Sequence, residues 1–163
     1  MTSKIRTVVV DDEPVARARV LALLGKEQDI EVVGEYSDGT EAVSAIRDTT
    51  PDLLFLDIQM AGMTGFELAD ALGPDRMPAV VFVTAYDEYA LRAFEIHALD
   101  YLLKPFSAQR FRSALTYARE HLAQRRATSL RQQILDMLPG IEPGHPAPAG
   151  AIAAGSKAAQ AGG

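Results

Sequence analysis

Five short apolar runs alternate with amphipathic segments over roughly the first 120 residues of the chain. The runs have strand length, are rich in Val, Leu, Ile or Phe, and cover residues 5–10, 31–36, 52–56, 79–83 and 98–102. At least three of them are apolar enough to be buried on both faces, which is typical of strands in a parallel sheet. The pattern therefore predicts a core built around a parallel β-sheet.

Helical signals lie between these runs. Pro14 stands at a first-turn position of one amphipathic segment, and Asp38 with Glu41 forms a capping pair at the start of another. Further helices are expected over 66–72, 87–96 and from residue 107 onward. Five βα units with right-handed crossovers predict an α/β fold of flavodoxin-like type, with a doubly wound five-stranded parallel sheet of order 2-1-3-4-5 and helices on both faces. The functional site of such a fold lies at the carboxyl ends of its strands.

Composition divides the chain into three parts. Residues 1–122 hold the βα units, residues 123–138 continue a helical pattern beyond them, and residues 139–163 contain 8 Ala, 6 Gly and 4 Pro. The last part cannot bury a core, so we expect a disordered tail. Two interpretations of the extension stay open, a solvated amphipathic helix or linker, and a helix that forms a dimer or an interdomain contact.

Charge and cysteine content exclude several function classes. Residues 1–106 carry 9 basic and 19 acidic side chains, so this acidic body repels nucleic acid. The chain has no cysteine, which excludes disulfides, thiol nucleophiles and thiolate metal sites and favours a cytoplasmic location. Its apolar runs are far shorter than the roughly 18 residues that a membrane-spanning helix needs. Membrane insertion is therefore not expected.

Acidic residues follow two of the predicted strands at the point where each strand ends. Asp11 and Asp12 follow the first run, and Asp57 follows the third. Gathered at one sheet edge, each pair of carboxylates would repel by about 4 kcal/mol at 4 Å and an effective dielectric near 20, so the cluster needs a counterion. Oxygen ligands without His or Cys suit a hard cation, and few protein ligands favour Mg²⁺ over Ca²⁺.

Two further strand ends carry complementary groups. Thr84 follows the fourth run, and Lys104 with Pro105 follows the fifth. A single Asp after a strand is usually a turn residue or a helix cap, so the combination carries the argument. A hydroxyl and an ammonium suit the oxygens of a phosphoryl group, and a carboxylate beside them can act as the nucleophile.

Residues 4–122, with these five parts in this order, resemble the receiver domain of two-component response regulators. The resemblance implies that Asp57 is the phosphoacceptor, that Asp12 binds Mg²⁺ directly and that Asp11 binds it through water. It gives the remaining roles as follows: the backbone carbonyl of Gln59 is a metal ligand, Thr84 is the switch hydroxyl, Tyr101 is the aromatic switch residue, Lys104 contacts the phosphate, Ala85 leaves the site accessible, and the bond before Pro105 is cis.

Residues 85–94 and 100–105 are similar to the receivers of LytTR-class transcription regulators. That class carries a DNA-binding domain after its receiver, whereas this chain continues into the Ala/Gly/Pro-rich tail. Contact with DNA is therefore expected only through a C-terminal domain that the chain lacks. The family commonly has a proline in the loop after the phosphoacceptor strand, and residues 60–65 have none, which costs stiffness but no chemical group.

The resemblance implies a receiver that accepts a phosphoryl group from a sensor histidine kinase and controls a transcriptional output. It would catalyse only its own phosphorylation and dephosphorylation, so no external enzymatic turnover is expected. A homodimer is expected through residues 87–96, 98–102 and the start of the last helix.

Three alternatives are weighed against this function. An interaction module with a vestigial site is the main one. A haloacid-dehalogenase-type hydrolase needs an acid two residues after its nucleophile, where this chain has Gln59. A flavodoxin would need a hydroxyl-rich phosphate loop after the first strand, where Asp11, Asp12 and Glu13 would repel phosphate.

Overall fold

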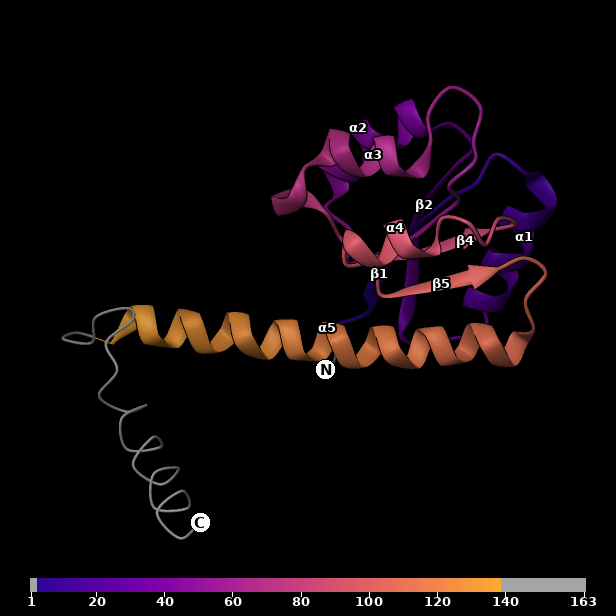
Figure 1. Cartoon of the computed structure of the whole chain (residues 1–163). Helices are drawn as coiled ribbons and strands as arrows, with labels where there is room; N and C mark the ends of the chain where they lie inside the picture. The colour runs from indigo at the N-terminus through magenta and orange to yellow at the C-terminus, as the bar shows by residue number, and fades with distance from the viewer. Residues whose placement is uncertain (1–2, 139–163) are drawn as a thin grey trace, which may run out of the picture. The chain divides into compact units, whose positions relative to one another are not determined.

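The computed structural model describes residues 3–138. In chain order its elements are β1 (Ile5–Val10), α1 (Pro14–Leu24), β2 (Ile30–Tyr36), α2 (Gly39–Thr49), β3 (Leu53–Leu56), α3 (Gly65–Leu72), the 3-10 turn η1 (Pro74–Arg76), β4 (Ala79–Thr84), α4 (Ala90–Glu95), β5 (Asp100–Leu103) and α5 (Ala108–Met137) (Figure 1). Strands and helices alternate throughout, as the hydrophobic pattern predicts. No helix among residues 3–138 is both long and apolar enough to cross a membrane.

The five strands form one parallel sheet in the order β2-β1-β3-β4-β5, which confirms the predicted fold class. Val10 pairs with Leu56 across β1 and β3, and Thr84 pairs with Leu103 across β4 and β5. Because neighbouring strands end in register, the residues that follow them leave the sheet at one edge. This register is what brings the candidate site together.

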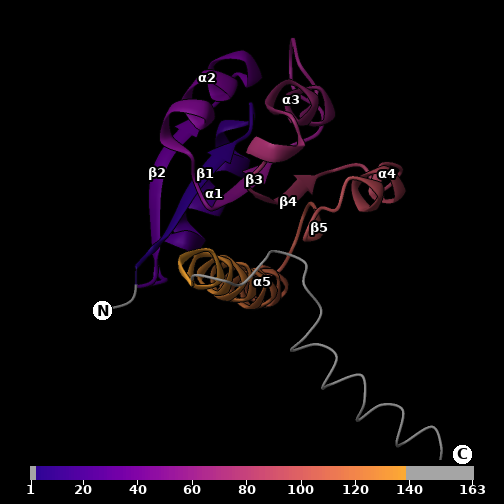
Figure 2. The ribbon, with the colours of Figure 1, turned by 90° about the vertical axis from the view of Figure 1, so that its left-hand side faces the viewer.

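Successive side chains of the strands point to opposite faces of the sheet and pack into two separate hydrophobic cores. Val9 and Phe55 point to the face covered by α1 and the first half of α5, where Phe55 stacks on Phe111 with ring centroids 5.2 Å apart. Val10 and Leu56 point to the opposite face, covered by α2 and α3 (Figure 2). The strands β3 and β4 are buried along their whole length, in agreement with the prediction that central strands are covered on both faces.

Local sequence signals set several helix starts. Pro14 begins α1, and the Asp38 side chain caps α2 by accepting from the Thr40 amide at 2.8 Å. Thr64 and Glu67 form a reciprocal capping box at the start of α3, with both hydrogen bonds at 3.1 Å. The β3–α3 loop therefore ends at a defined point although it contains no proline.

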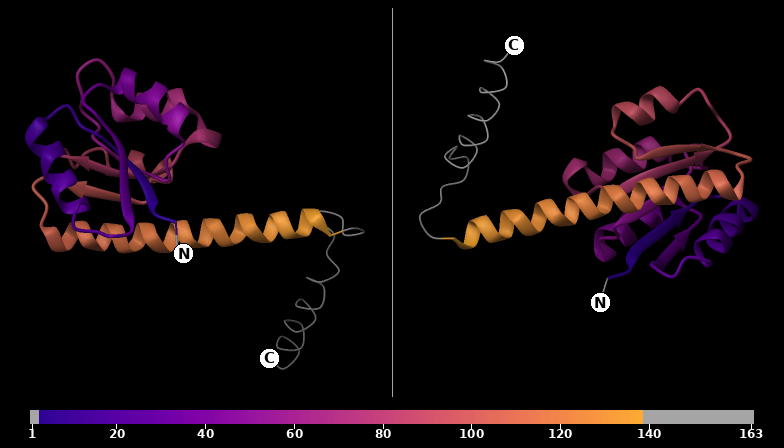
Figure 3. Two further views of the ribbon diagram at one scale, coloured as in Figure 1. Left: turned by 180° about the vertical axis from the view of Figure 1, so that it is seen from behind. Right: turned by 90° about the horizontal axis from the view of Figure 1, so that it is seen from below.

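The helix predicted over 87–96 is wrong at its start, because α4 begins only at Ala90. Residues 87–89 form a turn that the Ala90 amide closes on the Asp87 carbonyl at 3.3 Å. The large apolar side chain of Phe94 in α4 is 80% exposed. In α4 only Ala93 is buried, and the view from below places this short helix at the edge of the molecule (Figure 3).

The chain divides into two compact units between Leu122 and Ala123. Within the first unit, α5 buries Phe111, Leu115 and further small residues against the sheet. Arg119 fastens this part of α5 to the loop before β2 through Asp29 and Glu27, each at 2.7 Å. In the second unit, all described residues, 123–138, are exposed, and the tail predicted over 139–163 lies outside the described residues.

Candidate functional site

Three carboxylates converge where β1 and β3 end. The Asp11 amide donates to the Tyr36 carbonyl and the Asp57 amide donates to the Val10 carbonyl, each at 3.0 Å, so the strand pairing continues into both acidic positions. One carboxylate oxygen from each of Asp11, Asp12 and Asp57 lies within 4.8 Å of the others. Asp11 and Asp57 are buried, whereas Asp12 is partly exposed. The sequence-based expectation that these acids share one edge agrees with this geometry.

The β3–α3 loop is held close to this cluster. Asp12 accepts from the Ala61 amide at 3.1 Å, which ties the loop to the end of β1. A Cβ at Gly65 would lie 2.6 Å from the Asp57 carbonyl oxygen, so only glycine allows α3 to start this close to the acidic strand end. Gln59 lies in this loop two residues after Asp57.

Lys104 reaches the cluster from β5. Its amide donates to the Thr84 carbonyl at 2.7 Å, and the Lys104–Pro105 peptide bond is cis, the isomer that the resemblance implies. The Lys104 Nζ atom lies 2.9 Å from Asp11 Oδ2, 2.7 Å from Glu13 Oε1 and 3.4 Å from Asp57 Oδ2. The ammonium is therefore a counterion that the crowded carboxylates require.

Burial and neighbouring charges shift the pKa values of Asp57 and Lys104. Burial raises the pKa of Asp57 from 3.8 to about 6, although the charge of Lys104 acts in the opposite direction. Burial acts to lower the pKa of Lys104, but hydrogen bonds to Glu13 and Asp11 outweigh it and raise that pKa. Lys104 stays charged at neutral pH, and Asp57 is a more basic carboxylate than an exposed one.

Tyr86 lies between the two residues expected to form the switch. The Thr84 Oγ1 atom accepts from the Tyr86 amide at 3.4 Å. The Tyr101 hydroxyl donates to the Tyr86 carbonyl, and burial raises the pKa of Tyr101. Thr84 is fully buried at the end of β4. The start of the β4–α4 loop is therefore held by β5 through Tyr101.

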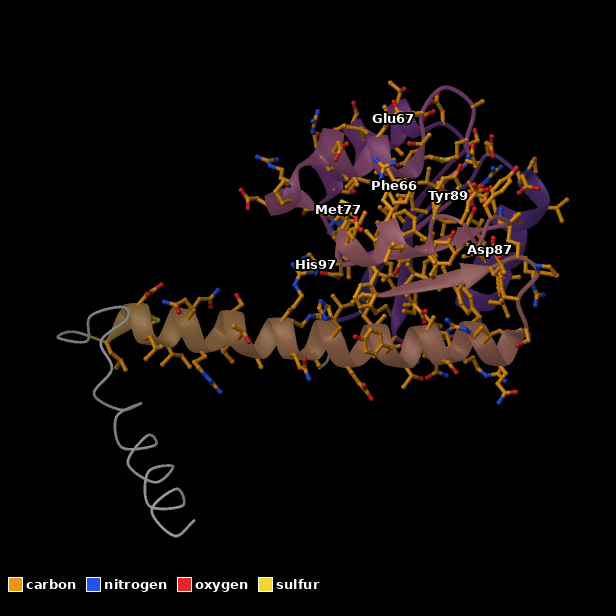
Figure 4. The ribbon with its side chains drawn as sticks, in the orientation of Figure 1. Phe66, Glu67, Met77, Asp87, Tyr89 and His97 are labelled. Atoms are coloured by element: carbon orange, nitrogen blue, oxygen red, sulfur yellow. The ribbon has the colours of Figure 1, made fainter. Side chains whose placement is uncertain are left out.

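A second set of contacts links the β3–α3 loop and α3 to α4 and the turn before it, and no pattern in the sequence predicted these contacts. The Gln59 side-chain amide donates to the Tyr89 hydroxyl at 2.5 Å. The Tyr89 ring meets Phe66 of α3 edge-on, with centroids 6.0 Å apart, and Figure 4 shows these two side chains close together. Arg92 of α4 lies over the other ring of this pair, 4.3 Å from the Phe66 centroid. Its guanidinium adds a cation–π contact between α4 and α3.

Glu13 was not predicted to take part in the site, yet it makes the shortest contact to Lys104. The available signal was its position immediately after Asp11 and Asp12. Sequence spacing alone could not tell whether its long side chain turns toward the lysine or toward solvent.

The donor set fits a magnesium ion. Hard oxygen ligands, two of them buried carboxylates, gather on one side of a site that offers neither a thiolate nor an imidazole ligand. The side chains of Asp11, Asp12 and Asp57 are the ones here that could hold such an ion. The partial exposure of Asp12 leaves room for water ligands, which Mg²⁺ usually retains.

Comparison with known sequences gives a consistent result. The sequence profile of the response regulator receiver domain matches residues 7–116. The transcriptional regulatory protein BtsR of Salmonella typhi is 44% identical over 137 residues, which cover 83% of this chain and 57% of that protein. An uncharacterized response regulatory protein of Yersinia pestis is 54% identical over 112 residues, or 69% of this chain and 47% of that protein. The chain therefore spans about half the length of these relatives.

Solved structures agree with the fold. The response regulatory domain of mrkE from Klebsiella pneumoniae has a TM-score of 0.68 at 30% identity, covering 73% of this chain and 98% of that one. The signal receiver domain of the putative response regulator NarL from Mycobacterium tuberculosis has a TM-score of 0.64 at 34% identity, covering 72% and 98%. In both cases nearly the whole solved domain is matched.

Proposed function

The chain belongs to the response regulator receiver domain family, and from this premise we propose that it accepts a phosphoryl group on Asp57 from a sensor histidine kinase. The observation that carries the proposal is the surroundings of Asp57. Its buried carboxylate lies 3.4 Å from the Lys104 ammonium and shares a 4.8 Å cluster with Asp11 and Asp12. Asp11 is also buried and lies 2.9 Å from Lys104, so the choice of Asp57 as the nucleophile rests in addition on its match to the phosphoacceptor position of the family, directly after β3.

The proposed reaction is a direct phosphoryl transfer. An Asp57 carboxylate oxygen attacks the phosphorus of the donor, the bond from phosphorus to the leaving atom breaks, and the leaving group departs with that electron pair. A phosphohistidine donor keeps the pair on its imidazole nitrogen. Acetyl phosphate would yield the Asp57 acyl phosphate and acetate, with no net proton transfer. Lys104 and Thr84 would hold phosphoryl oxygens through their ammonium and hydroxyl groups.

Magnesium is the cofactor that we propose for this transfer. Asp11, Asp12, Asp57 and the Gln59 carbonyl would hold it, and the ion would offset the negative charge of the carboxylates and of the phosphoryl oxygens. Without the ion, a phosphoryl donor would approach three carboxylates whose negative charge is offset by the single ammonium of Lys104. The protein would modify only itself, because the nucleophile is its own side chain.

The signal would leave the site through Thr84 and Tyr101. Attraction of the Thr84 hydroxyl to a phosphoryl oxygen would weaken its contact with the Tyr86 amide, which is 3.4 Å long. The Tyr101 ring would then turn inward and release the Tyr86 carbonyl, to which it now donates. Both changes act on one loop, so they bias the same pair of states.

A homodimer through the face formed by α4, β5 and the start of α5 is the proposed consequence. Leu91 and Phe94 of α4 are 72% and 80% exposed, and Leu103 of β5 is 44% exposed. These apolar side chains supply the packing that exposed ion pairs cannot, since each such pair is worth at most about 1 kcal/mol. The relative BtsR is named a transcriptional regulatory protein, so we propose a transcriptional output for the protein in which this receiver acts.

Intact-mass spectrometry after incubation with acetyl phosphate and Mg²⁺ tests the proposal. One phosphate adduct is expected on the wild-type chain and none on Asp57→Asn. A wild-type chain that never gains phosphate would favour the alternative, an interaction module with a vestigial site. An adduct that persists in Asp57→Asn would move the phosphoacceptor elsewhere.

A further inference from the structure

The Lys104 ammonium is held most closely by a residue outside the proposed cation site. Its Nζ atom lies 2.7 Å from Glu13 Oε1, compared with 2.9 Å to Asp11 and 3.4 Å to Asp57. The contact to Asp57 is longer than an ordinary charge-assisted hydrogen bond, whereas the contact to Glu13 has the usual length. In this structure the lysine is therefore bound mainly to Glu13 and Asp11.

The main chain of Glu13 is fixed by hydrogen bonds, whereas its side chain is largely exposed and contacts Lys104. Its amide donates to Asp11 Oδ1 at 2.9 Å, and its carbonyl accepts from the Arg17 amide at 3.0 Å in the first turn of α1. Its side chain is 62% exposed and makes no capping hydrogen bond to the helix. Replacing this carboxylate by an amide of the same shape should therefore leave the fold intact.

We propose that Glu13 is a positioning residue that holds Lys104 away from Asp57 in the unphosphorylated state and so opposes phosphorylation. The proposal rests on the function proposed above, because it assigns Glu13 a role in the same transfer. When Asp57 carries a phosphoryl group, the ammonium must turn toward the phosphoryl oxygens. The phosphoryl oxygens then compete with Glu13 for the same ammonium.

Two physical effects act in the same direction. Breaking the pair between Glu13 and Lys104 costs part of the free energy that Lys104 gains from the phosphoryl group. The negative charge of the Glu13 carboxylate also repels an incoming phosphoryl dianion, in addition to the repulsion from the other carboxylates of the site. Solvent screening at an exposed side chain keeps both effects modest.

The first experiment compares Glu13→Gln with the wild type. The rate of phosphate incorporation from acetyl phosphate with Mg²⁺, followed by intact mass, should rise about two- to fivefold, as expected for loss of one exposed ion pair. Glu35→Gln is the matched control, because Glu35 is also exposed and ion-paired, 3.7 Å from Arg17, but has no contact with Lys104. Its rate should equal that of the wild type.

A double-mutant cycle with Lys104→Ala separates a role through the lysine from a simple charge effect. If Glu13 acts by holding Lys104, then Glu13→Gln accelerates the wild type clearly more than it accelerates Lys104→Ala. Equal acceleration in both backgrounds would overturn the positioning role. An unchanged rate in Glu13→Gln, with normal phosphorylation of the wild type, would overturn it as well.

A measurement without magnesium or phosphodonor tests the contact itself. The carboxylate carbon signal of Glu13 in NMR spectra of the unphosphorylated protein should shift on Lys104→Ala, because the paired ammonium is removed. An unmoved signal would show that the pair does not form in solution and would overturn the proposal. Failure of the proposed function looks different, because then the wild-type chain itself gains no phosphate on Asp57.

Discussion

The Lys104 amide donates to the Thr84 carbonyl at 2.7 Å, so the proposed phosphate-binding ammonium and switch hydroxyl are joined through their main chains. This bond follows directly on the pairing of Thr84 with Leu103 at the ends of β4 and β5. The two groups therefore share one rigid edge of the sheet, although 20 positions separate them in the sequence. Preorganised groups of this kind lose little freedom when a phosphoryl group arrives.

The first prediction concerns stability against pH in magnesium-free buffer. The pKa of Asp57 is raised from 3.8 to about 6 in the folded state. At pH values between these two, Asp57 is therefore protonated to a larger fraction in the folded state than in the unfolded state. The contribution of Asp57 is therefore most favourable below about pH 4 and is lost as pH rises through about 6. Thermal unfolding between pH 4 and 8 should show this loss in the wild type and not in Asp57→Asn.

The size of the Asp57 pKa shift sets the expected difference in unfolding free energy between Asp57→Asn and the wild type. About two pKa units correspond to at most about 3 kcal/mol, so Asp57→Asn should be more stable than the wild type at pH 7 by about 1–3 kcal/mol. The difference between the two proteins isolates Asp57 from other titrating carboxylates. A wild type that gains stability relative to the variant between pH 4 and 6 would contradict the raised pKa.

The second prediction concerns the metal. Asp12→Ala should slow phosphorylation from acetyl phosphate by about 10- to 100-fold at limiting Mg²⁺, because it removes a proposed ligand and the acceptor of the Ala61 amide. Wild-type protein treated with a chelator should be slowed similarly. Asp48→Ala, an exposed acid on α2, is the control and should keep the wild-type rate. Equal rates with and without chelator would exclude the proposed role of magnesium.

Much of this architecture follows from particular residues in the sequence. Strand ends could be placed because Asp11 and Asp57 interrupt apolar runs, and parallel pairing then puts them at one edge. Side-chain direction could not be obtained in this way. The hydrophobic pattern does not show that Phe94 is exposed while Ala93 of α4 is buried, and it does not show that the long side chain of Glu13 turns toward Lys104. The contact of Gln59 with Tyr89 depends on loop geometry that no periodicity encodes.

The third prediction tests the close approach at Gly65. Gly65→Ala would place a methyl group 2.6 Å from the Asp57 carbonyl oxygen, so the loop must move and stability should fall by about 1–3 kcal/mol. Gly25→Ala is the control, because φ there is −62° and its Cβ would meet only ordinary contacts at 3.4 Å or more. This control should be neutral or up to about 1 kcal/mol more stable. Chemical denaturation measures both, and equal effects would remove the special status of Gly65.

The fourth prediction concerns self-association. Sedimentation across a concentration series should show a higher association constant for the phosphorylated protein than for the unphosphorylated one. Tyr101→Ala should abolish this difference, because it removes the contact with the Tyr86 carbonyl and uncouples the site from α4. Identical constants for both wild-type forms would argue against the switch.

Apolar packing at the proposed dimer face is tested separately. Phe94→Ser should weaken association without loss of stability, since the side chain is 80% exposed. Val15→Ser on α1, where the side chain is 84% exposed, is the matched control and should associate like the wild type. Equal weakening by both variants would show that general surface hydrophobicity, and not the α4 face, drives association.

Because Ala93 is the single buried side chain of α4, the exposed surface of this helix can change in sequence without disturbing the core. Ala93 is the one residue of α4 that is buried in the core, and the exposed side chains of Leu91 and Phe94 contribute little to the folding free energy. Substitutions at these two positions can change which molecule is recognised at almost no cost in stability. The residues that select a partner are therefore different from those that stabilise the fold. A duplicated copy of this domain could acquire a new partner through substitutions on α4 while the residues of its acidic site stay unchanged.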